Sequence, residues 1–156
     1  MADIFPTGYF ASLNAFSGTT PEEIQKSTVL LFGCGPSLGA EAWNFKEDEE
    51  GLRQRVKDLT DGRGADIVIE VVGNSSALRM GFDLLRPWGR ISSVGVHNQD
   101  IPWTGNETYA KNLRLQMGRC PVRSIFGPGM GLFEKKQDVL NFMSQDIRPL
   151  SQAVQA

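Results

Sequence analysis

The chain has 156 residues, of which 40% are hydrophobic and 22% are charged, and its formal net charge is −2. This length allows one domain with a buried core, and the composition is ordinary for a globular protein. The nearly balanced charge gives no sign of a nucleic-acid partner or of an anionic membrane surface. The longest apolar runs are far too short to cross a bilayer. With no secretory signal and only two cysteines, Cys34 and Cys120, we expect reduced thiols in a cytoplasmic protein.

The first predicted elements are a helix and a buried strand. Residues 3–16 predict a short helix entered through a turn at residues 6–8, and residues 17–21 predict a loop. Residues 28–32 form an apolar, β-branched run that Gly33 stops, which is typical of a buried parallel strand.

Residues 41–45 are a candidate for a further strand. Two parallel strands need a crossover of roughly a dozen residues or more, usually a helix. Too few residues separate this candidate from the run that ends at Phe32. It therefore has no easy parallel place beside the first strand.

The rest of the chain alternates between helix and strand patterns. Residues 48–61 put Leu52, Val56 and Leu59 on one apolar stripe, as in an amphipathic helix, and Asn74 is a good N-cap for another helix. The later elements follow in the order strand 65–72, helix 74–85, strand 90–96, strand 113–118 and helix 130–145. This alternation predicts an α/β fold of Rossmann-like type, with a mainly parallel sheet and helices on both faces.

A Gly-x-Gly motif stands directly after the first strand, at Gly33-Cys34-Gly35-Pro36. In a dinucleotide-binding fold the first glycine makes a tight turn, and the second lets the backbone approach a pyrophosphate. The pattern is incomplete here. Leu38 stands where a third glycine is due, and Arg53 stands about 20 residues on, where an acid would hold the ribose. The motif alone could equally be a plain turn, but the strands that follow it favour a dinucleotide-binding origin.

Four motifs in a fixed order are more specific than any one of them. They are Asp3-Ile4-Phe5-Pro6-Thr7-Gly8-Tyr9, Gly33-Cys34-Gly35-Pro36, Glu70-Val71-Val72-Gly73 and Ser93-Val94-Gly95-Val96. With these motifs the chain resembles the zinc-dependent, medium-chain alcohol dehydrogenases over essentially its whole length. It looks closest to the branch with sorbitol, threonine and formaldehyde dehydrogenases. The resemblance implies hydride transfer between an alcohol or polyol and NAD or NADP, with zinc polarising the oxygen.

The resemblance also implies a domain division and a gap. Residues 1–20 would be the remnant of a linking helix from an absent catalytic domain, and residues 21–156 a partial dinucleotide-binding domain. The family pattern continues after Gly-x-Gly-Pro through a helix and a second strand, whereas here Pro36 is joined directly to Ser37. Roughly thirty residues, a βαβ unit's worth of chain, are then missing. We therefore expect an incomplete sheet, in a truncated paralogue, a splice variant or a wrongly predicted gene.

Cofactor contacts are expected where strands end. The resemblance implies contacts from Thr7, near the nicotinamide, and from the turn Gly33-Cys34-Gly35-Pro36. It also implies contacts from two later strand ends, at Val72, Gly73, Val94, Gly95 and Val96, although Gly73 would also suit an ordinary strand-to-helix turn. Arg119 and Arg123 could each reach a pyrophosphate as bidentate donors, or be solvated at the surface.

Metal binding and catalysis are not expected from the chain alone. Asp3 corresponds by resemblance to an acidic ligand of the catalytic zinc, but Cys34, His97 and Cys120 lack the spacing of zinc ligands. We interpret His97, the only histidine, as a surface loop residue, although imidazole titrates near neutral pH. The glycine-rich residues 127–131 predict a flexible lead-in to the last helix.

These features predict an NAD(P)-binding remnant that binds its cofactor weakly or not at all and oxidises no alcohol by itself. The alternative is a non-catalytic interaction module that pairs with a full-length dehydrogenase subunit. Ile101–Trp103 and Leu113–Met117 resemble the edge strands through which family members dimerise, although Trp103 and Leu115 also suit ordinary core packing. An unpaired edge could also prevent stable folding.

Overall fold

The computed structural model describes residues 4–33 and 40–136. The helices are α1 (Ile4–Phe16), α2 (Pro21–Lys26), α3 (Glu49–Leu59), α4 (Ser75–Leu84), α5 (Gly105–Lys111) and α6 (Val122–Lys135). The strands are β1 (Val29–Phe32), β2 (Ala65–Glu70), β3 (Leu85–Ser93) and β4 (Arg114–Met117). None of the helices described is long and apolar enough to span a membrane.

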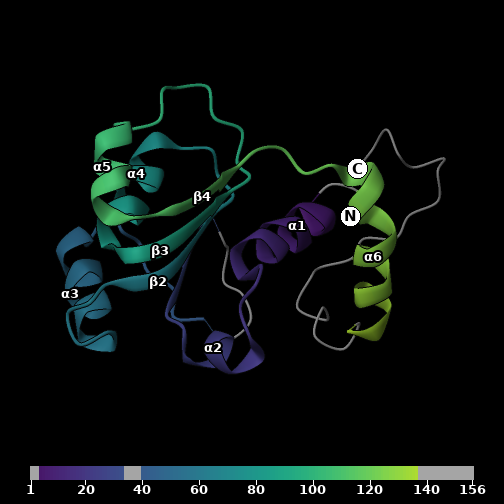
Figure 1. Cartoon of the computed structure of the whole chain (residues 1–156), viewed down its shortest axis with the longest axis horizontal. Coiled ribbons are helices and arrows are strands. Elements are labelled where there is room, and N and C mark those ends of the chain that lie inside the picture. The colour runs from purple at the N-terminus through teal and green to yellow at the C-terminus, as the bar shows by residue number, and fades with distance from the viewer. Residues whose placement is uncertain (1–3, 34–39, 137–156) are drawn as a thin grey trace, which may run out of the picture.

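The four strands form one parallel sheet in the order β1-β2-β3-β4, so neighbours in sequence are neighbours in space. The α/β prediction and the parallel sheet are confirmed. Figure 1 shows α3, α4 and α5 on one side of the sheet and α1 on the other, which agrees with the expected layers. In the described chain, Gly33 and residues 40–64, with α3, lie between the end of β1 and the start of β2.

Two apolar clusters lie on opposite faces of the sheet. The alternation of β2 separates them, because Val68 packs with α3 and α4 while Ile67 and Ile69 pack with α1. From α1, Ala11 and Ala15 enter the second cluster with no more than 1% of their surface exposed. Helix α1 is therefore part of this core.

Residues 41–45 form no strand, so the candidate strand is wrong. Glu41 instead receives hydrogen bonds from Arg55 of α3 at 2.9–3.1 Å, and Trp43 Nε1 donates to the carbonyl oxygen of Asp48 at 2.8 Å. Phe45 packs edge-on against Phe32 of β1, with ring centroids 5.9 Å apart. The segment therefore lies against α3 in the helix layer and not in the sheet.

Helix α6 begins at Val122, eight residues before the predicted start, so residues 127–131 lie inside the helix and are not a flexible lead-in. The packing of α6 against α1 explains this result. Gly129 is buried, and a Cβ there would lie 3.7 Å from the rings of Phe5 and Tyr9. Phe133 packs edge-on against Phe5, with ring centroids 5.1 Å apart. Tertiary contact therefore outweighs the local helix-breaking tendency of glycine and proline.

Other boundaries also differ from the sequence patterns. Residues 6–8 lie inside α1 and form no turn before it, and α2 and α5 were not expected as helices. Ile101–Trp103 form no strand; Trp103 is half-buried and stacks on Phe82, with ring centroids 4.6 Å apart. Ordinary packing therefore explains Trp103. The predicted edge strand 113–117 is confirmed as β4.

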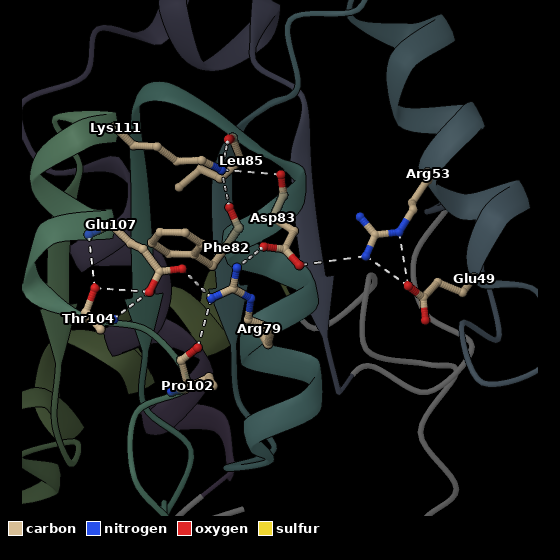
Figure 2. A network of polar contacts seen from close by, with 10 residues as sticks. All are labelled: Glu49, Arg53, Arg79, Phe82, Asp83, Leu85, Pro102, Thr104, Glu107 and Lys111. Carbon is tan, nitrogen blue, oxygen red and sulfur yellow. Dashed lines mark hydrogen bonds and ion pairs between the residues drawn. The ribbon is translucent and has the colours of Figure 1, made fainter.

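A polar network joins the three helices on one side of the sheet (Figure 2). Arg79 of α4 forms ion pairs with Asp83 at 2.8 Å and with Glu107 of α5 at 2.7 Å. Asp83 also lies 3.7 Å from Arg53 of α3. Lys111 Nζ donates to the carbonyl oxygens of Phe82, Asp83 and Leu85, where α4 passes into β3. These contacts satisfy carbonyl groups that a helix end leaves without partners.

Candidate functional site

The candidate site is the edge of the sheet where the strands end. Because β1, β2 and β3 are parallel, the residues that follow them meet at one edge: Gly33 after β1, residues 71–73 after β2 and residues 94–97 after β3. This is the edge where open α/β sheets bind ligands. The structure therefore brings Gly33, Val72, Gly73 and the segment Val94–Val96 together, as the sequence predicts.

Glu70, the last residue of β2, is fully buried at this edge. Its Oε1 accepts hydrogen bonds from the backbone N–H groups of Val72 at 2.7 Å and Gly73 at 2.5 Å. Its Oε2 accepts a hydrogen bond from Ser93 Oγ at 2.7 Å. A buried carboxylate is tolerated only when its oxygens are bonded in this way. The carboxylate therefore fixes the turn after β2 and ties it to the end of β3.

His97 completes the cluster, and its side chain is only 12% exposed. Its Nε2 lies 2.9 Å from Glu70 Oε2 and 2.9 Å from Ser93 Oγ, while its Nδ1 is buried without a hydrogen-bond partner among the described residues. The interpretation of His97 as a surface loop residue is therefore wrong. Local sequence cannot reveal this pairing, because Glu70 lies 27 residues earlier.

The turns after β2 and β3 touch backbone to backbone. A Cβ on Gly73 would lie 2.7 Å from Val96 N, and Gly73 has a φ of 78°. A Cβ on Gly95 would lie 2.6 Å from the Cα of Gly73. A Cβ on Gly33 would lie 2.5 Å from Val72 Cγ2. These glycines permit the approach of one loop to the next, which is a packing role in addition to any contact with a ligand.

Two apolar side chains remain available at this edge. Val72 is 52% exposed and Val96 is 53% exposed, although they lie in the tightly packed turns after β2 and β3. Thr7 is half-buried on α1, and Arg123 is exposed on α6, which packs against α1. Asp3 and the motif residues Cys34, Gly35 and Pro36 lie outside the described residues.

A resident metal does not fit the described residues. Within residues 4–33 and 40–136, no three His, Cys, Asp or Glu side chains gather in a way that would hold an ion. His97, the only histidine, is engaged with Glu70. No catalytic step is therefore assigned to zinc in this chain.

The comparison with known families agrees with this geometry. Residues 35–145 match the family described as zinc-binding dehydrogenase. The chain belongs to that family. It is also 57% identical to zinc-type alcohol dehydrogenase B of Aspergillus flavus, over 99% of this chain and 44% of that protein. A medium-chain reductase/dehydrogenase of an Acremonium species is 34% identical over 70% of this chain and 48% of its own length.

The solved structures give the same fold. An alcohol dehydrogenase of Thermotoga maritima has a TM-score of 0.74 and 26% identity, covering 97% of this chain and 50% of that chain. Family membership and the Rossmann-like fold are thus confirmed. The chain spans less than half the length of these curated relatives.

The alignment with the Aspergillus flavus relative bears on the expected gap. It runs over 186 positions, although this chain has 156 residues, so at least 30 positions of the relative have no counterpart here. This difference equals the roughly thirty residues expected from one βαβ unit's worth of chain. The placement of the gap after Pro36 stays a prediction.

Proposed function

We propose that this chain is the dinucleotide-binding part of a zinc-type alcohol dehydrogenase-like oxidoreductase, and that its carboxyl edge holds the nicotinamide end of NAD or NADP. Residues 1–20 would derive from the linking helix, and residues 21–156 from the nucleotide-binding domain. The observation that carries the proposal is the pair of strand ends, after β2 and β3, that Glu70 ties together beside two exposed valines.

Each residue at this edge has a definite task in the proposal. Val72 and Val96 offer apolar contact to a planar ring, and the backbone of Val94–Val96 offers polar groups to a carboxamide. The Gly33-Cys34-Gly35-Pro36 turn would lie near the pyrophosphate, with Arg123 as a charged donor and Thr7 near the nicotinamide. The valine exposures of 52% and 53% support this assignment.

The cofactor, when bound, would supply hydride transfer. The residues of this chain would bind and orient it, and we assign none of them to proton transfer or to a metal. We therefore predict no alcohol oxidation by the isolated chain with NAD and zinc added, as measured by NADH absorbance. The cytoplasmic location stays a prediction.

Calorimetric titration of the whole chain with NAD, and separately with NADP, tests the proposal. We expect weak but measurable binding that Val96→Asp abolishes, because a charged carboxylate would replace the apolar contact with the nicotinamide ring. Leu59→Asp is the matched control, since Leu59 is also 53% exposed but lies on α3. Absence of heat with both cofactors, or equal binding by both variants, would overturn the proposal.

A second candidate is an interaction module that pairs with a full-length dehydrogenase subunit. The supporting observation is β4, the last strand of the sheet in the described part of the chain, whose Leu115 and Met117 are 37% and 36% exposed. Light scattering of the chain mixed with the purified Aspergillus flavus relative tests it. A complex that the double variant Leu115→Lys/Met117→Lys abolishes would support the module, and two separate species would exclude pairing with that relative.

A further inference from the structure

The opposite edge of the sheet, where the strands begin, contains a hollow of about 520 Å³. Its walls come from the loop before α2, from α2 and from the first residues of β2, β3 and β4. Small-molecule sites in proteins usually have volumes of roughly 300–1,000 Å³. The hollow lies at the end of the sheet away from Glu70 and the cofactor edge, so the proposed function does not use it.

The charge around this hollow is strongly one-sided. The five cationic side chains in its walls are Lys26, Arg63, Arg86, Arg90 and Arg114. Two carboxylates, Glu23 and Asp66, accompany them. The whole chain has a net charge of −2, so this excess of positive charge is local. A concave surface with one sign of charge concentrates oppositely charged ligands.

Only some of these cations are engaged by the protein. Arg86 Nε donates to Asp66 Oδ1 at 2.6 Å, and Arg90 donates to the carbonyl oxygen of Ser17. Burial alone would raise the pKa of Asp66, but the hydrogen bonds from Arg86 and Thr28 outweigh burial and leave that pKa below its usual value. Asp66 is therefore an anion committed to Arg86.

Two arginines remain for a ligand. Arg63 lies 3.9 Å from Asp66 at its nearest nitrogen and is 59% exposed. The Arg114 guanidinium forms no hydrogen bond or ion pair with the described part of the chain. Arginine binds phosphate groups through two parallel N–H donors. The hollow therefore offers solvent-exposed donors of the kind that bind phosphate.

Trp88 adds a second, independent feature. It lines the hollow, is 65% exposed and has a φ of 62°. A bulky residue rarely adopts this left-handed backbone, and glycine would adopt it without strain. A strained backbone lowers the stability of the fold, and an exposed indole adds little to it. Residues with such strained backbone conformations are concentrated at ligand sites. An exposed indole face beside arginines is a suitable platform for an aromatic base.

We propose that this hollow binds a nucleoside phosphate, with the base on Trp88 and the phosphates on Arg63 and Arg114. A membrane surface is less well matched, because the residues enclose a hollow and two carboxylates line it. The site is separate from the carboxyl edge, so it can be occupied whether or not NAD binds there.

The test is calorimetric titration of the whole chain with ATP, adenosine and tripolyphosphate. We expect ATP to bind more tightly than either fragment, because it alone uses both the indole and the arginines. Trp88→Gly should weaken ATP binding about tenfold, which is within the range of one base–aromatic stack. The same variant should raise the melting temperature, because glycine relieves the backbone strain. A purely structural role for Trp88 would give a lower melting temperature.

Charge variants complete the test. Arg63→Gln/Arg114→Gln should weaken binding of ATP and of tripolyphosphate, whereas Lys46→Gln/Lys57→Gln, which removes two exposed charges elsewhere, should leave both unchanged. Val96→Asp should not alter ATP binding, so failure of the cofactor site and failure of this site can be distinguished. The proposal is overturned if ATP does not bind, if all variants bind it equally, or if only phosphatidylglycerol vesicles bind at Trp88.

Discussion

The two ends of the sheet are built in opposite ways. At the carboxyl end, Gly73 and Gly95 bring backbone against backbone, and the carboxylate of Glu70 is fully buried and bonded. At the amino end, long cationic side chains surround an open hollow, and Trp88 stands 65% exposed. The carboxyl end is therefore fixed by close backbone contacts and buried hydrogen bonds. The amino end carries exposed cationic side chains.

This contrast leads to different expected effects of mutations at the two ends. Where the shape of a site is set by buried backbone, any change of a side chain disturbs the fold and the site together. Where a site is formed by exposed side chains, a substitution changes binding with little effect on the free energy of unfolding. The buried groups of the carboxyl end should therefore respond to mutation mainly through stability, and the exposed side chains of the amino end mainly through ligand affinity.

The largest expected effect is that of Glu70→Ala. The variant leaves the N–H groups of Val72 and Gly73, and the His97 ring, without their acceptor at a position that is buried away from water. We expect the free energy of unfolding to fall by about 4 kcal/mol, as measured by urea unfolding followed by circular dichroism.

Glu41→Ala is the control for Glu70→Ala. Glu41 also accepts hydrogen bonds from a basic residue, Arg55, but both side chains are exposed, at 50% and 42%. Water replaces such contacts readily. Equal losses in the two variants would contradict the view that the carboxyl end depends on its buried carboxylate.

Gly95→Ala should have the next largest effect. The added Cβ would meet the backbone of Gly73, which cannot move without shifting the turn after β2. We expect a loss of about 3 kcal/mol in the same urea assay. Gly131→Ala in α6 has nothing within 4 Å of its Cβ and should instead stabilise the chain by about 1 kcal/mol. The same sign in both variants would show that backbone contact does not govern the carboxyl end.

The sequence predicts the carboxyl end only in part. The apolar run of β2 and the Asn74 cap, which accepts from the N–H groups of Ser76 and Ala77, are local features and were predicted correctly. The bond between Glu70 and His97 depends on how β2 and β3 pair, which local sequence does not contain. The sequence therefore indicates these strands to within two or three residues of their carboxyl ends, but not the group that holds the ends together.

Helices α5 and α6 illustrate two different failures. For α5 a signal was present, because Thr104 and Glu107 form a capping box, with spacing that is visible in the sequence. For α6 no local signal could suffice, since Pro128 and the neighbouring glycines disfavour a helix. Its packing against Phe5, more than 100 residues earlier, decides the structure. Contacts distant in sequence thus account for what remained unpredicted.

The smallest expected effect concerns the charged layer that supports the start of β3. Hydrogen bonds from the Thr104 backbone and from Arg79 lower the pKa of Glu107 to about 2. Because this pKa is below its unfolded value of 4.5, Glu107 stabilises the fold above pH 4.5, and this contribution is lost as the pH falls toward 2. Its side chain is 39% exposed, so water and salt weaken the contribution. We expect Glu107→Gln to have a lower melting temperature than the unmodified chain at pH 7 and the same melting temperature near pH 2. A difference in melting temperature that stays constant between these pH values would mean that Glu107 acts through packing and not through its charge.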